Sequence, residues 1–157
     1  MRMVTTTPEA AARAPKPAGP AVRRRWVRTI KVYWPVARQT LVSAAAGELD
    51  ALRSDETLTP LLDILETAPE LGDFGVYGDV FEACLGVEGF TVRPGARPAH
   101  GVVGGRFLSS TLAITTYVDA SMDDDELSHV LTRITDAHPW EVPVVELSAP
   151  LELISRA

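Results

Sequence analysis

A histidine and a glutamate three residues apart are the side chains best suited to proton transfer in this chain. His138 and Glu141 lie in the stretch AHPWEVPVVEL (137–147), separated by Pro139 and Trp140. Neutral histidine titrates near working pH, and a nearby carboxylate can orient it, so the two could act as catalytic acid and base. The alternative is structural, because a histidine at a helix C-terminus suits the helix dipole and can hydrogen-bond the corner. We favour the structural role.

The same corner could hold a metal ion, since histidine nitrogen and glutamate oxygen both bind zinc. Two mixed ligands without a third nearby in the sequence are weak evidence, so we assign no metal ligand, and the cofactor is unknown. Cys84 is the only cysteine, which excludes an internal disulfide and a cysteine-rich metal centre. Because it lies in an apolar run, we expect it to be buried rather than nucleophilic.

A second set of candidate residues lies in the glycine-rich middle of the chain. A ligand in a cleft between subunits could contact Tyr77, Asp79, Arg93, His100, Arg106 and, from the corner, Trp140. The alternative is that Tyr77 packs and Asp79 makes a turn hydrogen bond. The loop RPGARPAHGVVGG (93–105) is not a phosphate-binding loop, because it lacks G-x-x-x-x-G-K and does not open a helix.

The charge of the chain is divided unequally. The net charge is −6 at pH 7, but residues 1–25 carry six basic residues against one glutamate, which is +5 and leaves −11 for the rest. An acidic folded part argues against a nucleic-acid-binding surface. No run of 18 apolar residues exists, and the N-terminus lacks the apolar core of a secretory signal. With the single cysteine, this predicts a cytoplasmic protein without a nucleic-acid or membrane partner.

Length and composition predict one folded domain. A chain of 157 residues with 46% hydrophobic residues can bury one substantial core but not two. Residues 1–24 are rich in alanine and proline, and we expect them to form a disordered basic leader. Residues 25–157 form the expected domain.

Hydrophobic periodicity predicts strands interleaved with helices. Gly47 weakens the first helical pattern and is expected to break it. Thr59 is the expected N-cap of the second helix and Ser121 that of the third. A turn at 86–88 is expected to join two short strands into a hairpin. Strand patterns lie at 26–35, 79–85, 89–93, 106–119 and 142–147, and helix patterns at 36–52, 59–67 and 122–138.

This order predicts an α+β fold. Strands interleaved with two helices in this way form a ferredoxin-like split βαβ arrangement, an antiparallel sheet with both helices on one face. The other face is too apolar for bare solvent, which predicts homo-oligomerisation through it. Its residues are Val27, Thr29, Tyr33, Thr115 and Tyr117.

Two stretches resemble the small ferredoxin-like domain found inside YqfO-type proteins. Residues 75–104 match its G-x-Y turn, its strand and its G-x-F-x-x-P-G-A-x-P-x-x-G-x-x-G loop, and AHPWEVP matches its A-H-P-Y-E-x-P corner. The EVP ending is similar to that of the trimeric CutA proteins, so the resemblance to this PII-like superfamily implies a homotrimer. The matching positions are Gly75, Tyr77, Gly89, Phe90, Pro94, Gly95, Ala96, Pro98, Gly101, Gly104, His138, Pro139, Glu141 and Pro143.

The chain also departs from the family pattern. Trp140 replaces the usual tyrosine of the corner. The span 48–73 is longer than the pattern, and we interpret it as a helical insertion. The dinuclear metal site of full-length relatives belongs to a flanking domain outside the matching region, so its ligands are not carried over.

The resemblance and the candidate residues together predict an oligomeric regulatory module that binds a small ligand or a metal ion between subunits. Trp140, Tyr77 and the backbone of residues 94–105 would supply binding energy, and His138 and Glu141 would set the charge.

Two alternatives remain open, because one scaffold hosts many activities. The first is a small enzyme of a specialised pathway, a cyclase, isomerase or hydrolase. His138 would be its base, Glu141 the orienting partner, and Tyr77 or Asp79 the acid. The second is a structural assembly partner that acts through Trp26 and the basic leader.

Overall fold

The computed structural model describes residues 22–156. It contains the strands β1 (Val22–Pro35), β2 (Phe81–Thr91), β3 (Arg106–Asp119), β4 (Val145–Leu147) and β5 (Leu151–Arg156). Its helices are α1 (Arg38–Ala45), α2 (Asp50–Arg53), α3 (Thr59–Thr67) and α4 (Asp124–Ala137). No helix in this part of the chain is long and apolar enough to cross a membrane.

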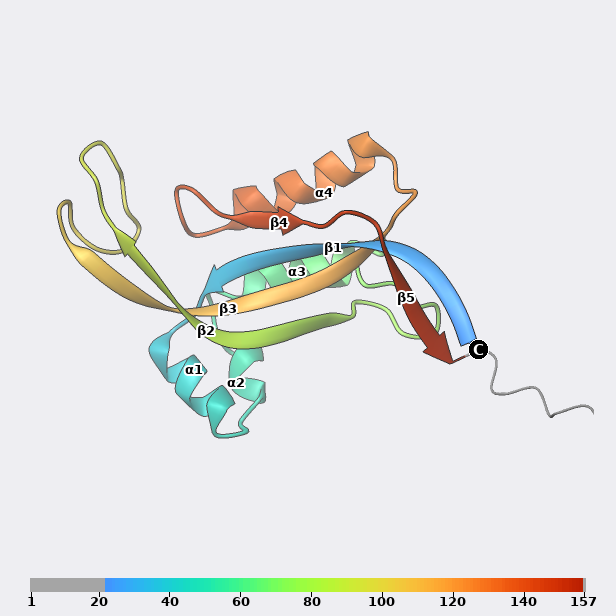
Figure 1. Cartoon of the computed structure of the whole chain (residues 1–157). Coiled ribbons are helices and arrows are strands. Elements are labelled where there is room, and N and C mark those ends of the chain that lie inside the picture. The colour runs from blue at the N-terminus through green and yellow to red at the C-terminus, as the bar shows by residue number, and fades with distance from the viewer. Residues whose placement is uncertain (1–21, 157) are drawn as a thin grey trace, which may run out of the picture.

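The five strands form one antiparallel sheet with the order β2-β3-β1-β4, and β5 pairs with the N-terminal half of β1 (Figure 1). β2 and β3 extend with their connecting loop beyond one end of the sheet, while β5 and the start of β1 extend beyond the other. This strand order is that of the split βαβ arrangement, so the predicted ferredoxin-like α+β fold is confirmed.

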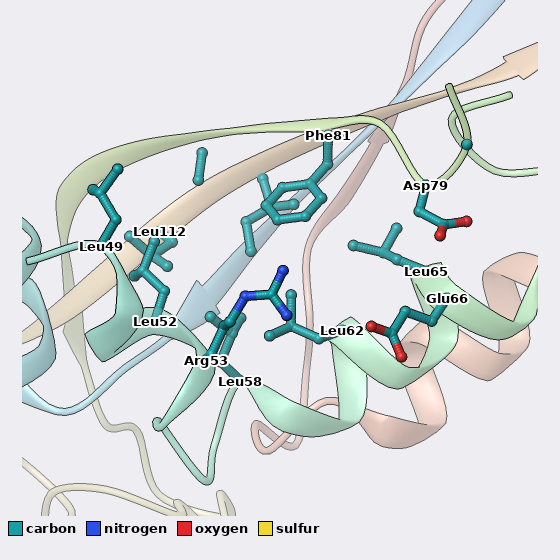
Figure 2. A pocket seen from close by; sticks show the side chains of 13 residues that line it. Leu49, Leu52, Arg53, Leu58, Leu62, Leu65, Glu66, Asp79, Phe81 and Leu112 are labelled. Atoms are coloured by element: carbon teal, nitrogen blue, oxygen red, sulfur yellow. The ribbon is translucent and has the colours of Figure 1, made fainter. Parts of the chain in front are cut away.

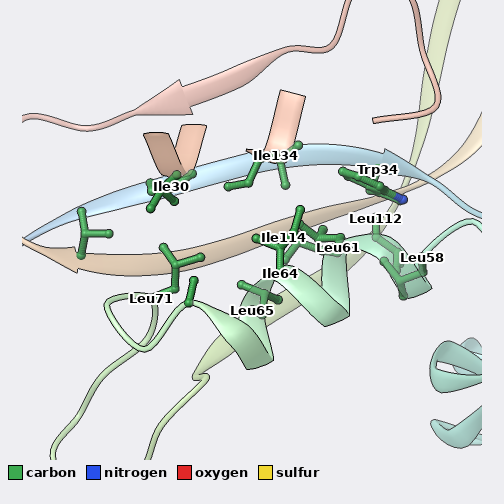
Figure 3. Close-up of a cluster of buried hydrophobic side chains, with 14 of the residues drawn as sticks. Ile30, Trp34, Leu58, Leu61, Ile64, Leu65, Leu71, Leu112, Ile114 and Ile134 are labelled. Atoms are coloured by element: carbon green, nitrogen blue, oxygen red, sulfur yellow. The ribbon is translucent and has the colours of Figure 1, made fainter. Parts of the chain in front are cut away.

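The core lies between the sheet and two helices, α3 and α4 (Figure 3). Trp34 and Leu112 are paired in register on neighbouring strands and are fully buried. Ile64 of α3 and Ile134 of α4 cover the same sheet face. Burying one such side chain contributes about 1.5–3 kcal/mol of folding free energy. The alternating apolar residues of the strands therefore determine which face of the sheet packs against α3 and α4.

The helix that covers the sheet after β1 is α3, which lies inside the expected insertion 48–73. Its residues Leu61, Ile64 and Leu65 are buried in the core. The preceding helical pattern breaks at Gly47, as predicted, where φ is +93°. An insertion within 48–73 stays a prediction, but α3 is part of the core and not an appendage to it.

β2 corrects one sequence prediction. The two short strands expected at 79–85 and 89–93 form one strand that pairs with β3 along its whole length, from Phe81 opposite Thr116 to Thr91 opposite Arg106. The reversal of the chain takes place in the following loop, not at 86–88. Glycine can adopt the extended geometry of a strand. Gly86 therefore continues β2, because β3 supplies hydrogen-bond partners for the residues before and after it.

The boundaries of several elements also differ from expectation. Asp123, not Ser121, is the N-cap of α4, and its side chain accepts a hydrogen bond from the Asp125 amide. Thr59 is already helical, with Leu58 at the cap position. The last predicted strand is ordered as a strand only from Val145.

Most of the expected leader lies outside the described residues, but its end does not. Val22, Arg23 and Arg24 belong to β1 and pair with β5. The Arg24 guanidinium also lies 3.0 Å from a Glu152 carboxylate oxygen. The prediction of disorder is therefore wrong for these residues, because they pair with β5 in the sheet.

The uncovered face of the sheet, which we call the open face, differs from expectation at two residues. Val27 lies on it by register, opposite Asp119 and two residues before Thr29, but it is fully buried instead of open to solvent. Cys84 was expected to be buried and is exposed. Its register partner Ala113 is in turn opposite Tyr33, which places the three residues in one row across the open face.

Candidate functional site

The β2–β3 ribbon and the corner after α4 enclose a cavity of about 330 Å³, which we call the corner cavity. Its lining comprises Glu88, residues 90–93, Ala96, residues 98–100 and residues 140–142. The loop 92–105 and the corner between α4 and β4 lie at the same end of the molecule (Figure 1). Residues far apart in the sequence therefore meet here because the long ribbon reaches beyond the helices.

A chain of aromatic contacts connects this cavity to the core. The ring of Trp34 lies 4.6 Å from that of His138, which lies 5.6 Å from Trp140. Trp140 in turn lies 5.7 Å from Phe90, which lies 6.1 Å from Phe107. Edge-to-face aromatic pairs contribute about 0.5–1.5 kcal/mol beyond simple burial. The cavity wall is therefore anchored to the buried centre of the protein.

His138 is buried, and hydrogen bonds occupy both of its ring nitrogens. Its Nε2 lies 2.8 Å from the Tyr33 carbonyl oxygen, and its Nδ1 accepts from the Trp140 amide at 3.0 Å. A carbonyl only accepts, so Nε2 carries the proton and the ring is neutral. Burial lowers the pKa of His138, against the opposing effect of the Tyr33 carbonyl. No ring nitrogen is left to take a proton from a ligand, and this geometry favours the structural role.

Glu141 fixes the loop to the corner. Its Oε2 accepts a hydrogen bond of 2.7 Å from the Arg97 amide, and the residue lines the cavity. No hydrogen bond joins Glu141 to His138 within residues 22–156. The two residues share a corner, but each binds a different backbone segment.

Glu88 is the site residue that the sequence prediction missed. Its Oε2 is buried without a hydrogen-bond partner in the described part of the chain. Burial raises the pKa of this carboxyl group above its ordinary value. A buried carboxylate oxygen without a hydrogen-bond partner is costly unless a bound group satisfies it. Nothing near Glu88 in the sequence indicates that it is buried, because it lies between valine and glycine in a predicted turn. Its burial depends on β2 continuing to Thr91.

The cavity gathers only some of the predicted site residues. Arg93, His100, Trp140 and Glu141 line it. Arg106 is exposed opposite Thr91 and does not belong to the lining. Tyr77, which is 71% exposed, and Asp79 precede the start of β2, whereas the cavity lies near its end. The structure therefore separates Tyr77 and Asp79 from the corner.

Ligating side chains do not gather into a metal site in the described residues. No three histidine, cysteine, aspartate or glutamate side chains between residues 22 and 156 lie close enough to hold one ion. The corner cavity combines aromatic walls with a few charged side chains that do not cluster, and such a lining is typical of an organic-ligand site.

Comparison with known proteins finds similar solved structures, and two of them illustrate the likeness. No protein-family model matches the chain, and no curated protein matches it significantly. A Bacillus cereus protein related to NIF3 aligns over 85% of this chain with 17% identity and a TM-score of 0.48, and the alignment spans 27% of that longer chain. The periplasmic divalent cation tolerance protein CutA from Archaeoglobus fulgidus aligns over 78% of this chain and 82% of its own, with 10% identity and a TM-score of 0.38. The fold assignment rests on the strand order of this chain itself.

Proposed function

We propose that this protein is a homo-oligomeric module that binds a small organic ligand in the corner cavity. The observation that carries the proposal is the unpartnered, buried Oε2 of Glu88, a residue that lines this cavity. The volume of about 330 Å³ is near the lower end of the range for small-molecule sites, about 300–1,000 Å³. The cavity therefore suits a compact ligand.

The lining indicates the chemistry of this ligand. Phe90 and Trp140 lie edge to face, and both line the cavity, so a flat apolar group would have aromatic contacts. Glu88 would accept a hydrogen bond from a cationic or N–H group of the ligand, and this bond would offset the cost of burying one of its carboxylate oxygens. We infer that the ligand is a planar molecule that carries a protonated nitrogen.

Titration with benzamidinium, monitored by amide chemical shifts, tests this binding mode. We expect saturable shifts at residues 88–100 and 140–142, and weaker shifts with neutral benzamide. Glu88→Gln should weaken benzamidinium binding about 10- to 100-fold, because it removes a charge-assisted hydrogen bond. Glu82→Gln on the same strand, outside this cavity, is the matched control. Equal binding of benzamide, or equal loss in both variants, would contradict the proposal.

The proposal of a homotrimer has separate support. The outer edges of β2 and of β4 have no strand partner in the described chain, and free edges are ready to pair with another chain. Leu85, Val87 and Leu108 are exposed on the β2–β3 ribbon, and Val144 is exposed before β4. Identical copies joined head to tail by two different edges close into a ring when the rotation allows.

Mass measurement tests the assembly. A trimer would have about three times the chain mass of 16.9 kDa in solution. Cys84 on the open face should react slowly with a maleimide reagent in the assembly and rapidly after mild denaturation. A mass of 16.9 kDa together with immediate labelling of Cys84 would refute oligomerisation through this face. A cytoplasmic location is part of the same proposal, and the single cysteine supports it.

Glu88 also supports a second candidate function, proton-transfer catalysis. A carboxyl group with a raised pKa is suited to donate a proton near neutral pH. In this alternative Glu88 is the acid, and His138 and Glu141 position the cavity walls. Recovery of a chemically changed ligand after incubation would favour the enzyme, whereas recovery of the unchanged ligand would favour the binding module.

A further inference from the structure

A second cavity of about 370 Å³, which we call the helix groove, lies between the start of β2 and the helices α2 and α3 (Figure 2). It exists because the helix layer covers the central strands but leaves the edge strand β2 open. Leu112 and Ile114 on β3 are fully buried, whereas Phe81 on the neighbouring strand β2 is 37% exposed. Ala83, opposite Ile114 in register, is too small to fill the space.

The walls of the groove are apolar and come from three parts of the chain. Leu52 comes from α2, Leu62 and Leu65 from α3, and Phe81 from β2. The side chains point toward one another across the groove in Figure 2. An apolar side chain of a ligand would be removed from water here, which stabilises the bound state by about 25 cal/mol per Å² buried.

Charged groups of opposite sign lie at two places in the groove. The guanidinium of Arg53 projects between the apolar walls, and the carboxylates of Glu66 and Asp79 lie beyond it on one side (Figure 2). None of the three forms an ion pair within 4.0 Å in residues 22–156. A guanidinium binds carboxylates through paired hydrogen bonds, and carboxylates bind ammonium groups. The two places together therefore offer partners for a head group that carries both charges.

Asp79 is held in position by the backbone around it. It is the single non-glycine residue with positive φ in the described chain, at +57°. The segment before it is fixed because the Gly72 amide donates to the Tyr117 carbonyl and its carbonyl accepts from the Val80 amide. A Cβ atom at Gly72 would lie 2.3 Å from the Val80 nitrogen, so only glycine allows this approach. Strained residues of this kind are concentrated at ligand sites.

We propose that the helix groove binds a small zwitterion with an apolar side chain, the chemical class of the hydrophobic α-amino acids. Arg53 holds the carboxylate of the ligand, Glu66 and Asp79 hold its ammonium group, and the side chain packs between Leu65 and Phe81. The site is separate from the corner cavity, and its test does not depend on the function proposed for that cavity.

Titration with L-phenylalanine, monitored by amide chemical shifts in α3 and at the start of β2, tests the proposal. We expect saturable shifts at residues 62–66 and 79–83, and binding at least 10-fold weaker for 3-phenylpropionate and phenethylamine, which each lack one charge. Arg53→Gln should weaken L-phenylalanine binding about 10- to 100-fold. Arg38→Gln, an exposed arginine of α1 outside the groove, is the matched control.

A second variant tests the location without removing a charge. Ala83→Leu would fill the floor of the groove and should abolish binding, with the fold checked by circular dichroism. Three results would overturn the proposal: no shifts at these residues with millimolar L-phenylalanine, 3-phenylpropionate binding as tightly as L-phenylalanine, or equal losses in Arg53→Gln and Arg38→Gln.

Discussion

β2 borders two cavities of similar size, one near each end and on opposite faces of the sheet. Phe81 and Ala83 line the helix groove, whereas Glu88 and Phe90 line the corner cavity. Side chains alternate between the two faces of a strand, so one strand can serve both cavities. What differs is how the walls are held.

The walls of the corner cavity are connected to each other by hydrogen bonds. Glu141 accepts from the Arg97 amide, and His138 accepts from the Trp140 amide while contacting Tyr33. The groove is bounded by the four-residue helix α2, which has no side-chain cap. The walls of the corner cavity are therefore held by hydrogen bonds between segments, whereas one wall of the groove is a short helix without a side-chain cap.

One buried aspartate connects two chain segments next to the helix groove. Asp55 accepts hydrogen bonds from the Ala37 amide, the Thr40 hydroxyl and the Thr57 amide, at 2.9, 2.6 and 2.9 Å. It joins the start of α1 to the turn before α3. Burial raises its pKa, but the hydrogen bonds from Thr40, Thr57 and Ala37 together outweigh this effect, so the pKa is lowered.

Replacement of Trp34 should have the largest effect, because this residue contacts both regions. Its Nε1 donates to the Thr57 carbonyl at 2.6 Å, and its ring lies against His138. We expect Trp34→Ala to reduce the free energy of unfolding by about 3–5 kcal/mol, measured by urea denaturation. Trp26→Ala, at a residue that is 58% exposed, should cost less than about 0.5 kcal/mol. Similar losses in both variants would show that Trp34 is not the link between the two regions.

Replacement of Asp55 should destabilise the segments next to the helix groove but not the corner. We expect Asp55→Ala to cost about 2–4 kcal/mol, because the buried Thr40 hydroxyl and two partly buried amides lose their acceptor. Amide exchange should accelerate in α1 and α3 but not at residues 138–142. The lowered pKa stabilises the fold above the unfolded-state value near 3.9, and this contribution is lost as pH falls through the folded-state value. Exposed Asp63→Ala is the control, and an equal loss there would contradict this role.

Replacement of His138 should affect the corner and respond to pH. We expect His138→Gln to cost about 1–3 kcal/mol at pH 7.5, because two hydrogen bonds of a buried side chain are disturbed. The fold requires neutral His138, and its lowered pKa means that the wild type loses stability as pH falls below about 6.5. The thermal midpoints of wild type and variant should therefore approach each other at pH 5.5. Exposed His129→Gln should show no such convergence, and a constant difference for His138→Gln would contradict this account.

Replacement of Glu88 should have the smallest effect and the opposite sign. Its raised pKa means that the charged form is disfavoured in the fold, so stability falls as pH rises above the unfolded-state value near 4.3. Glu88→Gln should therefore stabilise the protein at pH 7 by less than about 1 kcal/mol, with no gain at pH 4. Exposed Glu56→Gln is the control. A destabilised Glu88→Gln variant would show that the carboxylate has a structural partner.

Part of the candidate site was predictable from local patterns. His138, Trp140 and Glu141 follow a helix pattern that Pro139 ends, so their meeting at one corner depends on nearby residues alone. Arg93 and His100 belong to a loop whose glycines and prolines mark it as irregular. Glu88 and Asp55 were not predictable, because their burial depends on strands and helices distant in the sequence.

The sequence by itself determined that strand and helix regions alternate between residues 26 and 147 and which of their faces form the core, because alternation and helical periodicity are local properties. It did not predict β5. Only the tertiary structure decided that β2 runs unbroken beside β3, that His138 uses both ring nitrogens within the fold, and that two cavities open on either side of one strand. These outcomes depend on hydrogen-bond partners and packing surfaces that come from distant parts of the chain.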